Sequence, residues 1–130
     1  MDRRVFVRHA AGVLSALTMG TLTGSCAPAP ALDESTLLPH HLSRSLGADA
    51  VRGIGREYLA LTPRESEAST LRAALAASAR RHDRRTGVSS RSLDALVAAD
   101  FDAGRTVLVD GWLLAVSEAR QCALVVLTAV

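Results

Sequence analysis

Residues 106–127 read TVLVDGWLLAVSEARQCALVVL, and this stretch decides the fold that the sequence predicts. Two β-prone runs flank Asp110-Gly111, a dipeptide that favours a two-residue hairpin turn because both central positions need positive φ. An apolar helix follows directly, starting at about Glu118. A lone hairpin is only marginally stable in water, so this one must dock on helices. We therefore expect a β-hairpin over about 106–116, placed immediately before the last helix.

The last helix is apolar on nearly all sides, as buried helices are. Ser117 is expected to cap it, and Cys122 is expected to be a buried small hydrophobic residue. Trp112 is expected to anchor the hairpin in the core, the alternative being a tryptophan that stacks on a cofactor. A domain this small has little interior, so a partner could cover the remaining apolar surface. The candidate partner face comprises Trp112, Val126, Leu127 and Val130.

Apolar spacing predicts three further helices upstream. The first spans 49–61, and its Gly53 and Gly55 would allow another helix to approach closely. Thr62-Pro63-Arg64-Glu65 matches a capping box, which places the second helix from Pro63 to about Arg81. The third is expected over about 91–103. The predicted fold class is therefore mainly α: a small helical bundle with one β-hairpin before the last helix.

The region upstream of this bundle divides into two segments. Residues 26–45 contain Pro28, Pro30 and Pro39 and are predicted to form an irregular linker, which leaves 46–130 as the helical domain. Residues 1–25 are predicted to be a cleavable signal segment. Arg3-Arg4, Phe6 and a basic Arg8 precede a weakly apolar stretch, the pattern of a twin-arginine export signal. The alternative is a general secretory signal in which two arginines are adjacent by chance.

Two exits from the signal compete. Leu22 to Cys26 resembles a lipoprotein box, in which Cys26 would be lipidated and become the first residue. Ala29-Pro30-Ala31 instead offers a small-x-small cleavage site, which would extend the signal to Ala31. Either exit places the mature chain in the periplasm or cell envelope. Contact with the membrane is expected only through the signal or through a lipid on Cys26.

The charge distribution argues against nucleic acid as a partner. The formal net charge is +2, but the segment before Cys26 holds three arginines against one aspartate. That leaves twelve arginines against twelve acidic residues in the rest of the chain. A neutral domain lacks the basic surface that binding to phosphate backbones requires.

Few residues suggest chemistry. The run Arg80 to Arg85 is interpreted either as an anion or acidic-partner site or as a basic helix C-terminus that continues into a solvated loop. His40-His41 could bind a metal but lacks a ligand-spacing pattern, which favours a solvated loop. His82, Asp100 and Glu118 are candidate acid–base groups that spacing does not assemble into a catalytic set. We therefore assign no catalytic residue, no metal and no cofactor, because the chain also lacks a cofactor-binding motif.

The segment Asp100–Leu124, DFDAGRTVLVDGWLLAVSEARQCAL, resembles the C-terminal block of small bacterial proteins that carry twin-arginine signals. Gly104-Arg105 through Trp112 and Ser117 to Arg120 carry this resemblance. It implies no settled activity and no catalytic residue. The architecture also resembles the small subunits of periplasmic sugar and alcohol dehydrogenases, which accompany a flavin-bearing large subunit that has no signal of its own.

These observations lead to an expected function. A protein that crosses the membrane folded through the twin-arginine translocase, yet has no cofactor motif, suits the role of an accessory subunit. We expect it to partner and escort a large cofactor-bearing periplasmic oxidoreductase without catalysis of its own. The alternative is a stand-alone cell-envelope lipoprotein or binding module, and an enzyme in its own right is a third reading.

Overall fold

The computed structural model describes residues 32, 37–87 and 93–129. The signal residues Arg3, Arg4 and Phe6, the lipidation candidate Cys26 and the terminal Val130 lie outside the described residues. The elements in chain order are α1 (His40–Leu46), α2 (Ala48–Leu61), the 3₁₀ turn η2 (Pro63–Glu65), α3 (Ala68–Thr86), α4 (Leu93–Asp102), β1 (Thr106–Val109), β2 (Trp112–Ala115) and α5 (Val116–Thr128).

The predicted fold class is confirmed: the described chain is mainly helical, with one antiparallel hairpin immediately before the last helix. The turn residues Asp110 and Gly111 have φ of 48° and 78°, the positive values that the Asp-Gly turn requires. Strands β1 and β2 pair Val109 with Trp112 and Leu108 with Leu113.

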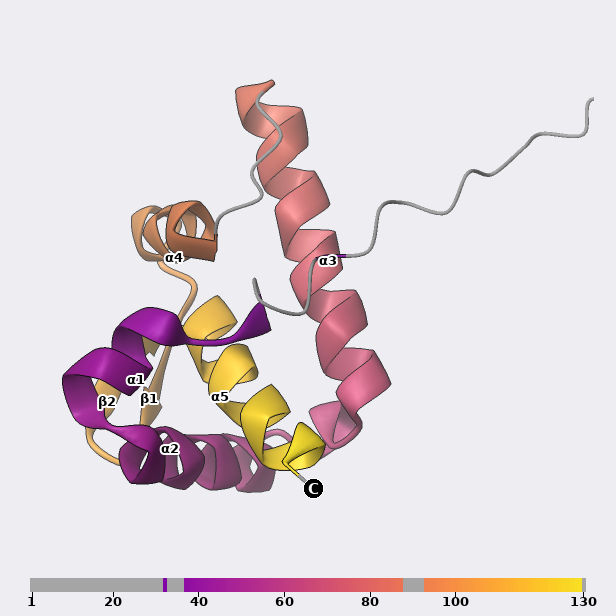
Figure 1. Ribbon diagram of the computed structural model, residues 1–130. Coiled ribbons are helices and arrows are strands. Elements are labelled where there is room, and N and C mark those ends of the chain that lie inside the picture. The colour runs from indigo at the N-terminus through magenta and orange to yellow at the C-terminus, as the bar shows by residue number, and fades with distance from the viewer. Residues whose placement is uncertain (1–31, 33–36, 88–92, 130) are drawn as a thin grey trace, which may run out of the picture.

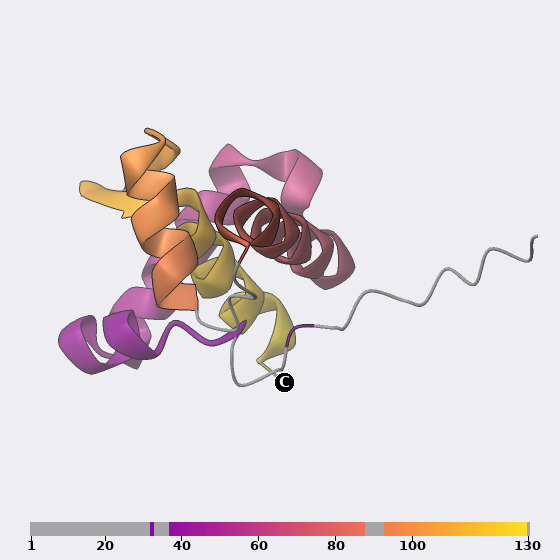
Figure 2. The same cartoon turned by 90° about the horizontal axis from the view of Figure 1, so that it is seen from above.

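Helix α5 runs through the middle of the molecule (Figure 1, Figure 2), where it contacts α2, α3, α4 and both strands. Its side chains from Ala119 to Leu124 are almost all buried, with Ala119, Cys122 and Ala123 at 0% exposure. The prediction that the last helix is buried is confirmed for this part, and so is the prediction that Cys122 lies in the core. Helices α2, α3 and α4 pack against this central helix, and α1 packs against α2.

Helices α2 and α5 make the most extensive contact in the bundle, and Gly55 lies at their crossing. A Cβ atom at Gly55 would overlap the carbonyl of Cys122 and come within 2.7 Å of Val126 Cγ2. A Cβ atom at Gly53 would meet nothing within 4 Å. The close helix approach that the sequence suggested is therefore confirmed at Gly55 and does not apply to Gly53.

The predicted linker needs a correction, because α1 occupies its last part. The helix buries Leu42 beside Leu37, which precedes it, and both belong to the hydrophobic core. No side chain caps its first turn. Burial of these leucines, and not a local capping signal, therefore accounts for a helix that the sequence pattern does not predict.

The predicted start of the second long helix at Pro63 is also wrong. Pro63 to Glu65 form a separate 3₁₀ turn, and α3 begins at Ala68 and continues beyond the predicted end to Thr86. The Thr62 side chain does not cap the start of the following turn, because its hydroxyl donates to the carbonyl of Tyr58 in α2 at 2.6 Å. Glu65 is engaged by side chains from two other elements, so the capping box does not form.

Trp112 is not the core anchor that we predicted, since 47% of it is exposed. Burial increases along β2, from exposed Trp112 and Leu113 to buried Leu114 and Ala115. Val109 and Leu114, at 0% and 4% exposure, are the residues that fix the hairpin in the core. Trp112 thus lies beside the turn with about half of its surface open to solvent, although its cross-strand partner Val109 is buried.

Candidate functional site

Asp100, at the end of α4, is a buried carboxylate on which three elements meet. One oxygen accepts a hydrogen bond from Arg105 Nε at 2.8 Å. The other accepts from the backbone N–H of Ser117 at 3.0 Å and from the Ser117 hydroxyl. Only 3% of Asp100 is exposed. Buried charge is tolerated when it is paired and fully hydrogen-bonded, as it is here.

The same carboxylate caps α5, which corrects the predicted role of Ser117. The residue before the helix is Ala115, which has no side-chain acceptor, and Ser117 lies fully buried in the first turn. Asp100 satisfies its N–H across 17 residues of sequence. Glu118 accepts from the N–H of Ala115 at 3.0 Å and completes the helix start.

Asp100 remains charged in this setting. Burial acts to raise the pKa of Asp100, but the hydrogen bonds from Ser117 and Arg105 outweigh it and hold that pKa below its ordinary value. Every acceptor oxygen of the carboxylate is occupied by the protein itself. Asp100 therefore holds α4, α5 and Arg105 in place, a structural role for one of the three candidate acid–base groups.

A second polar cluster joins η2, α2 and α5. Arg120 forms a two-pronged ion pair with Glu65, with N–O distances of 3.0 and 2.7 Å. The Tyr58 hydroxyl donates a hydrogen bond to the Glu65 carboxylate at 2.7 Å. The hydrogen bonds from Arg120 lower the pKa of Glu65, whereas burial and the nearby Glu65 charge raise the pKa of Tyr58 to about 12. This cluster holds η2, the turn between α2 and α3, against the central helix α5.

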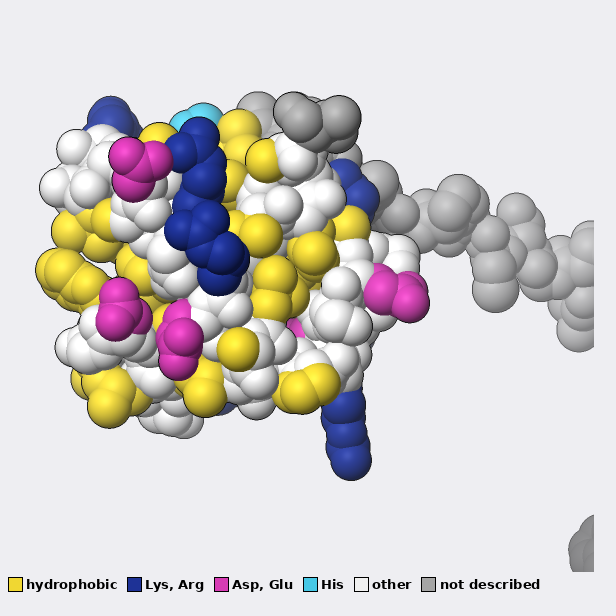
Figure 3. Space-filling view, turned by 90° about the horizontal axis from the view of Figure 1, so that it is seen from below, with side chains coloured by type: hydrophobic (Ala, Val, Ile, Leu, Met, Phe, Trp, Pro, Cys, Tyr) yellow, Lys and Arg dark blue, Asp and Glu magenta, His cyan; other side chains and the backbone are white. Residues whose placement is uncertain are grey.

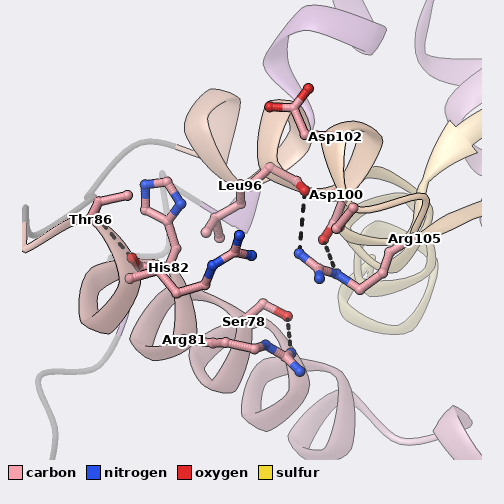
Figure 4. Close-up of a pocket in the computed structure, with 11 residues that line it drawn as sticks. Ser78, Arg81, His82, Thr86, Leu96, Asp100, Asp102 and Arg105 are labelled. Carbon is pink, nitrogen blue, oxygen red and sulfur yellow. Dashed lines mark hydrogen bonds and ion pairs between the residues drawn. The ribbon is translucent and has the colours of Figure 1, made fainter.

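A pocket of about 270 Å³ opens between the C-terminal half of α3 and the end of α4 (Figure 4). Its α3 wall includes Ser78, Arg81, His82 and Arg85, which recur at helical spacing on one face. Arg105 faces them from the loop after α4, and its guanidinium is directed into the pocket (Figure 4). The structure thus brings His82 and Asp100, two predicted candidates, to the same pocket.

This geometry refines the interpretation of the Arg80 to Arg85 run. All of the run lies within α3, whose last turn holds Arg84 and Arg85, so the run forms a basic helix C-terminus. All four arginines are exposed, but Arg81 and Arg85 line the pocket, whereas Arg80 and Arg84 do not. Helical spacing therefore divides the four arginines into a pair that borders the pocket and a pair that lies away from it.

The hairpin exposes three large apolar side chains, which we call the hairpin patch: Leu108, Trp112 and Leu113, exposed at 64%, 47% and 61%. Leu108 and Leu113 are direct partners, so their side chains project from the same face, whereas Trp112 pairs with Val109 and projects from the other face. By contrast, the face over α2 mixes charges of both signs with hydrophobic side chains (Figure 3). Arg52, which is exposed on α2, is paired with Asp49 at 2.8 Å.

The predicted partner-face residues do not gather in one place. Trp112 lies beside the hairpin turn on β2, whereas Val126 and Leu127 lie near the end of α5. Leu127 is 37% exposed, and Val126 is half-buried, with its Cγ2 methyl facing Gly55 of α2. Of the described members of that face, Trp112 and Leu127 are therefore the exposed ones, and they belong to different elements.

Cys122 and the histidine pair show no site geometry. Burial raises the pKa of the Cys122 thiol to about 12, so the thiol stays protonated. His40 and His41 begin α1 and are exposed. Among the described residues, no three His, Cys, Asp or Glu side chains lie close enough to bind a metal ion. No helix in ranges 37–87 and 93–129 combines the length and apolar character needed to cross a membrane.

Sequence reasoning missed both polar clusters. Asp100 reaches Ser117 across 17 positions and Arg120 reaches Glu65 across 55, so no local pattern could pair them. The α3 wall of the pocket did leave a signal, because Ser78, Arg81, His82 and Arg85 follow the helical period.

Comparison with protein-family models, curated proteins and solved structures found no match for this chain.

Proposed function

We propose that this protein is a non-catalytic exported accessory subunit that binds a larger cofactor-bearing oxidoreductase of the cell envelope. The observation that carries the proposal is the hairpin patch. Leu108 and Leu113 form an exposed apolar surface on one face of the hairpin, and Trp112 adds a half-exposed aromatic ring beside the turn. Apolar and aromatic side chains of this kind are typical of the centre of a protein interface. An exposed hairpin face can dock on a partner without any rearrangement of the bundle.

The internal polar groups support a binding role over a catalytic one. Asp100 and Glu65 are the buried or part-buried carboxylates of the described chain with lowered pKa values, and each is engaged by an arginine. Ser117 is fully buried by the bundle, so its hydroxyl cannot reach a substrate. These groups stabilise the fold, and the exposed chemistry of the chain is that of a docking surface.

The test is capture of the partner from the native cell envelope with a tagged full-length chain. Wild type is expected to retain a larger protein with a bound redox cofactor. The double variant Leu108→Ser/Leu113→Ser should lose this partner, because it removes the proposed apolar contact. The variant should still fold, since both side chains are more than half exposed and contribute little to the core. Leu61→Ser is the matched control, since Leu61 is 53% exposed on α2. Equal capture by wild type and the hairpin variant would overturn the proposed surface.

A further inference from the structure

The pocket between α3 and α4 concentrates positive charge from two parts of the chain. Arg81 and Arg85 come from one face of α3, and Arg105 comes from the loop that follows α4. The helix dipole favours basic residues at the end of α3, which accounts for arginine there in general. It does not account for Arg105, which approaches the same space from the opposite wall (Figure 4).

The acidic residues that line the pocket are Asp100 and Asp102. Asp100 forms an ion pair with Arg105 and accepts on its other oxygen from Ser117, so it does not pair with Arg81 or Arg85. The Asp102 side chain is exposed and is directed away from Arg81 and Arg105 (Figure 4). His82 adds two ring nitrogens to the pocket wall.

Two of the arginines are held in position before any ligand arrives. Arg105 donates through Nε to Asp100 at 2.8 Å and through Nη2 to the carbonyl of Ala99 at 3.4 Å. Arg81 donates to the hydroxyl of Ser78 at 3.4 Å. A guanidinium has five N–H groups, so each of these two keeps donors for a ligand. The Arg105 side chain is 37% exposed, which leaves its outer edge open to solvent.

We propose that this pocket binds a tetrahedral oxyanion, either inorganic phosphate or the phosphate group of a small monoester. Guanidinium groups pair strongly with phosphate oxygens, and several oxygens pointing in different directions can satisfy arginines from opposite walls. A planar carboxylate suits one two-pronged arginine and would leave the others without acceptors. The volume of about 270 Å³ lies just below the usual range for ligand pockets and suits a small anion.

The test measures the thermal unfolding temperature of the full-length chain as inorganic phosphate, methyl phosphate or acetate is added at constant ionic strength. Either phosphate probe should raise that temperature by mass action, and acetate should have a much weaker effect. A difference between the two phosphate probes would tell whether the free ion or a monoester is the better ligand. Acetate as effective as phosphate would overturn the proposed class of ligand.

Matched double variants on α3 then place the ligand. Arg81→Gln/Arg85→Gln removes the pair that borders the pocket, and we expect it to weaken phosphate binding at least about tenfold. Arg80→Gln/Arg84→Gln removes the same charge from the same turns, away from the pocket, and should change binding less than about twofold. Arg105 stays intact in both because it also anchors Asp100. Equal weakening in both variants would show that phosphate responds to overall charge, which would refute a pocket.

Discussion

Asp100 places a charge in the core of a domain that has few polar groups there, and it can do so because every oxygen is used. Its partners are the first-turn N–H and hydroxyl of Ser117 and the guanidinium of Arg105. Asp100 thereby fixes how α4, the loop residue Arg105 and the start of α5 meet. The identity of its partners depends on the tertiary fold, which is why helical spacing alone could not predict them.

Asp100→Asn should lower the free energy of unfolding by about 2 kcal/mol at pH 7, because charged hydrogen bonds of this kind are worth about 1.5–3 kcal/mol. Denaturation in urea measures this value. Asp94→Asn, at an exposed position of the same helix, is the control and should change it by less than about 0.5 kcal/mol. A variant as stable as wild type would contradict the capping role.

The difference in stability between wild type and Asp100→Asn should depend on pH. Because the pKa of Asp100 in the folded state lies below its ordinary value of 3.8, the unfolded chain takes up that proton first as the pH falls. Wild type therefore loses this stabilisation below pH 3.8, and its advantage over Asp100→Asn should shrink there. An advantage that stays constant from pH 7 into acid would show that the charge of Asp100 is not responsible.

Cys122 should be unreactive while the domain is folded. Burial raises the pKa of its thiol to about 12, and the side chain has no exposed surface. In a Cys26→Ser chain, where Cys122 is the remaining cysteine, we expect alkylation at pH 8 to be at least about a hundredfold slower than in urea. Equal labelling rates with and without urea would place this thiol at the surface.

At the scale of the elements, the sequence predicts those helices and strands that are determined by neighbouring residues. The hairpin was predictable because Asp110-Gly111 determines its own turn. Helix α1 was not, because burial of Leu42 against the rest of the bundle makes it helical. The break before Ala68 was missed for the same reason, since Glu65 is bound by Arg120 from α5 and is not free to cap.

The crossing of α2 and α5 gives a paired prediction at this scale. Gly55→Ala should destabilise the protein by about 1–3 kcal/mol, because the new methyl group would overlap the backbone of α5. Gly53→Ala should stabilise it by up to about 1 kcal/mol, since alanine favours a helix and the space is open. Thermal unfolding of both variants checks the pair. Shifts of the same sign would contradict the packing at this crossing.

At the scale of the whole molecule, most of the apolar surface of α5 is buried in the protein's own core. Among the described residues of α5, Leu127 is the large apolar side chain that stays exposed, and the hairpin exposes Leu108, Trp112 and Leu113. Sequence reasoning placed the partner face mainly on α5, because hydrophobic periodicity does not show how many other helices cover this helix. The proposed docking surface has accordingly moved to the hairpin, with Trp112 common to both.

The proposed twin-arginine export route makes a prediction about the intact chain. Replacing Arg3 and Arg4 together by lysine should abolish export, because the twin-arginine pattern requires the paired guanidinium groups and not their charge alone. Arg8→Lys, which keeps a basic residue outside the pair, is the control and should leave export largely intact. Fractionation of cells and detection of the chain measure the outcome. Unchanged export of the paired variant would point to the general secretory route.

The most direct measurement is the mass of the native assembly, determined by light scattering on protein isolated from the cell envelope without denaturants. The accessory-subunit proposal predicts that the chain elutes with a larger cofactor-bearing protein. It also predicts that the complex separates when Leu108 and Leu113 are replaced by serine. A chain that elutes alone at or below its monomer mass of 13.7 kDa would contradict the proposal.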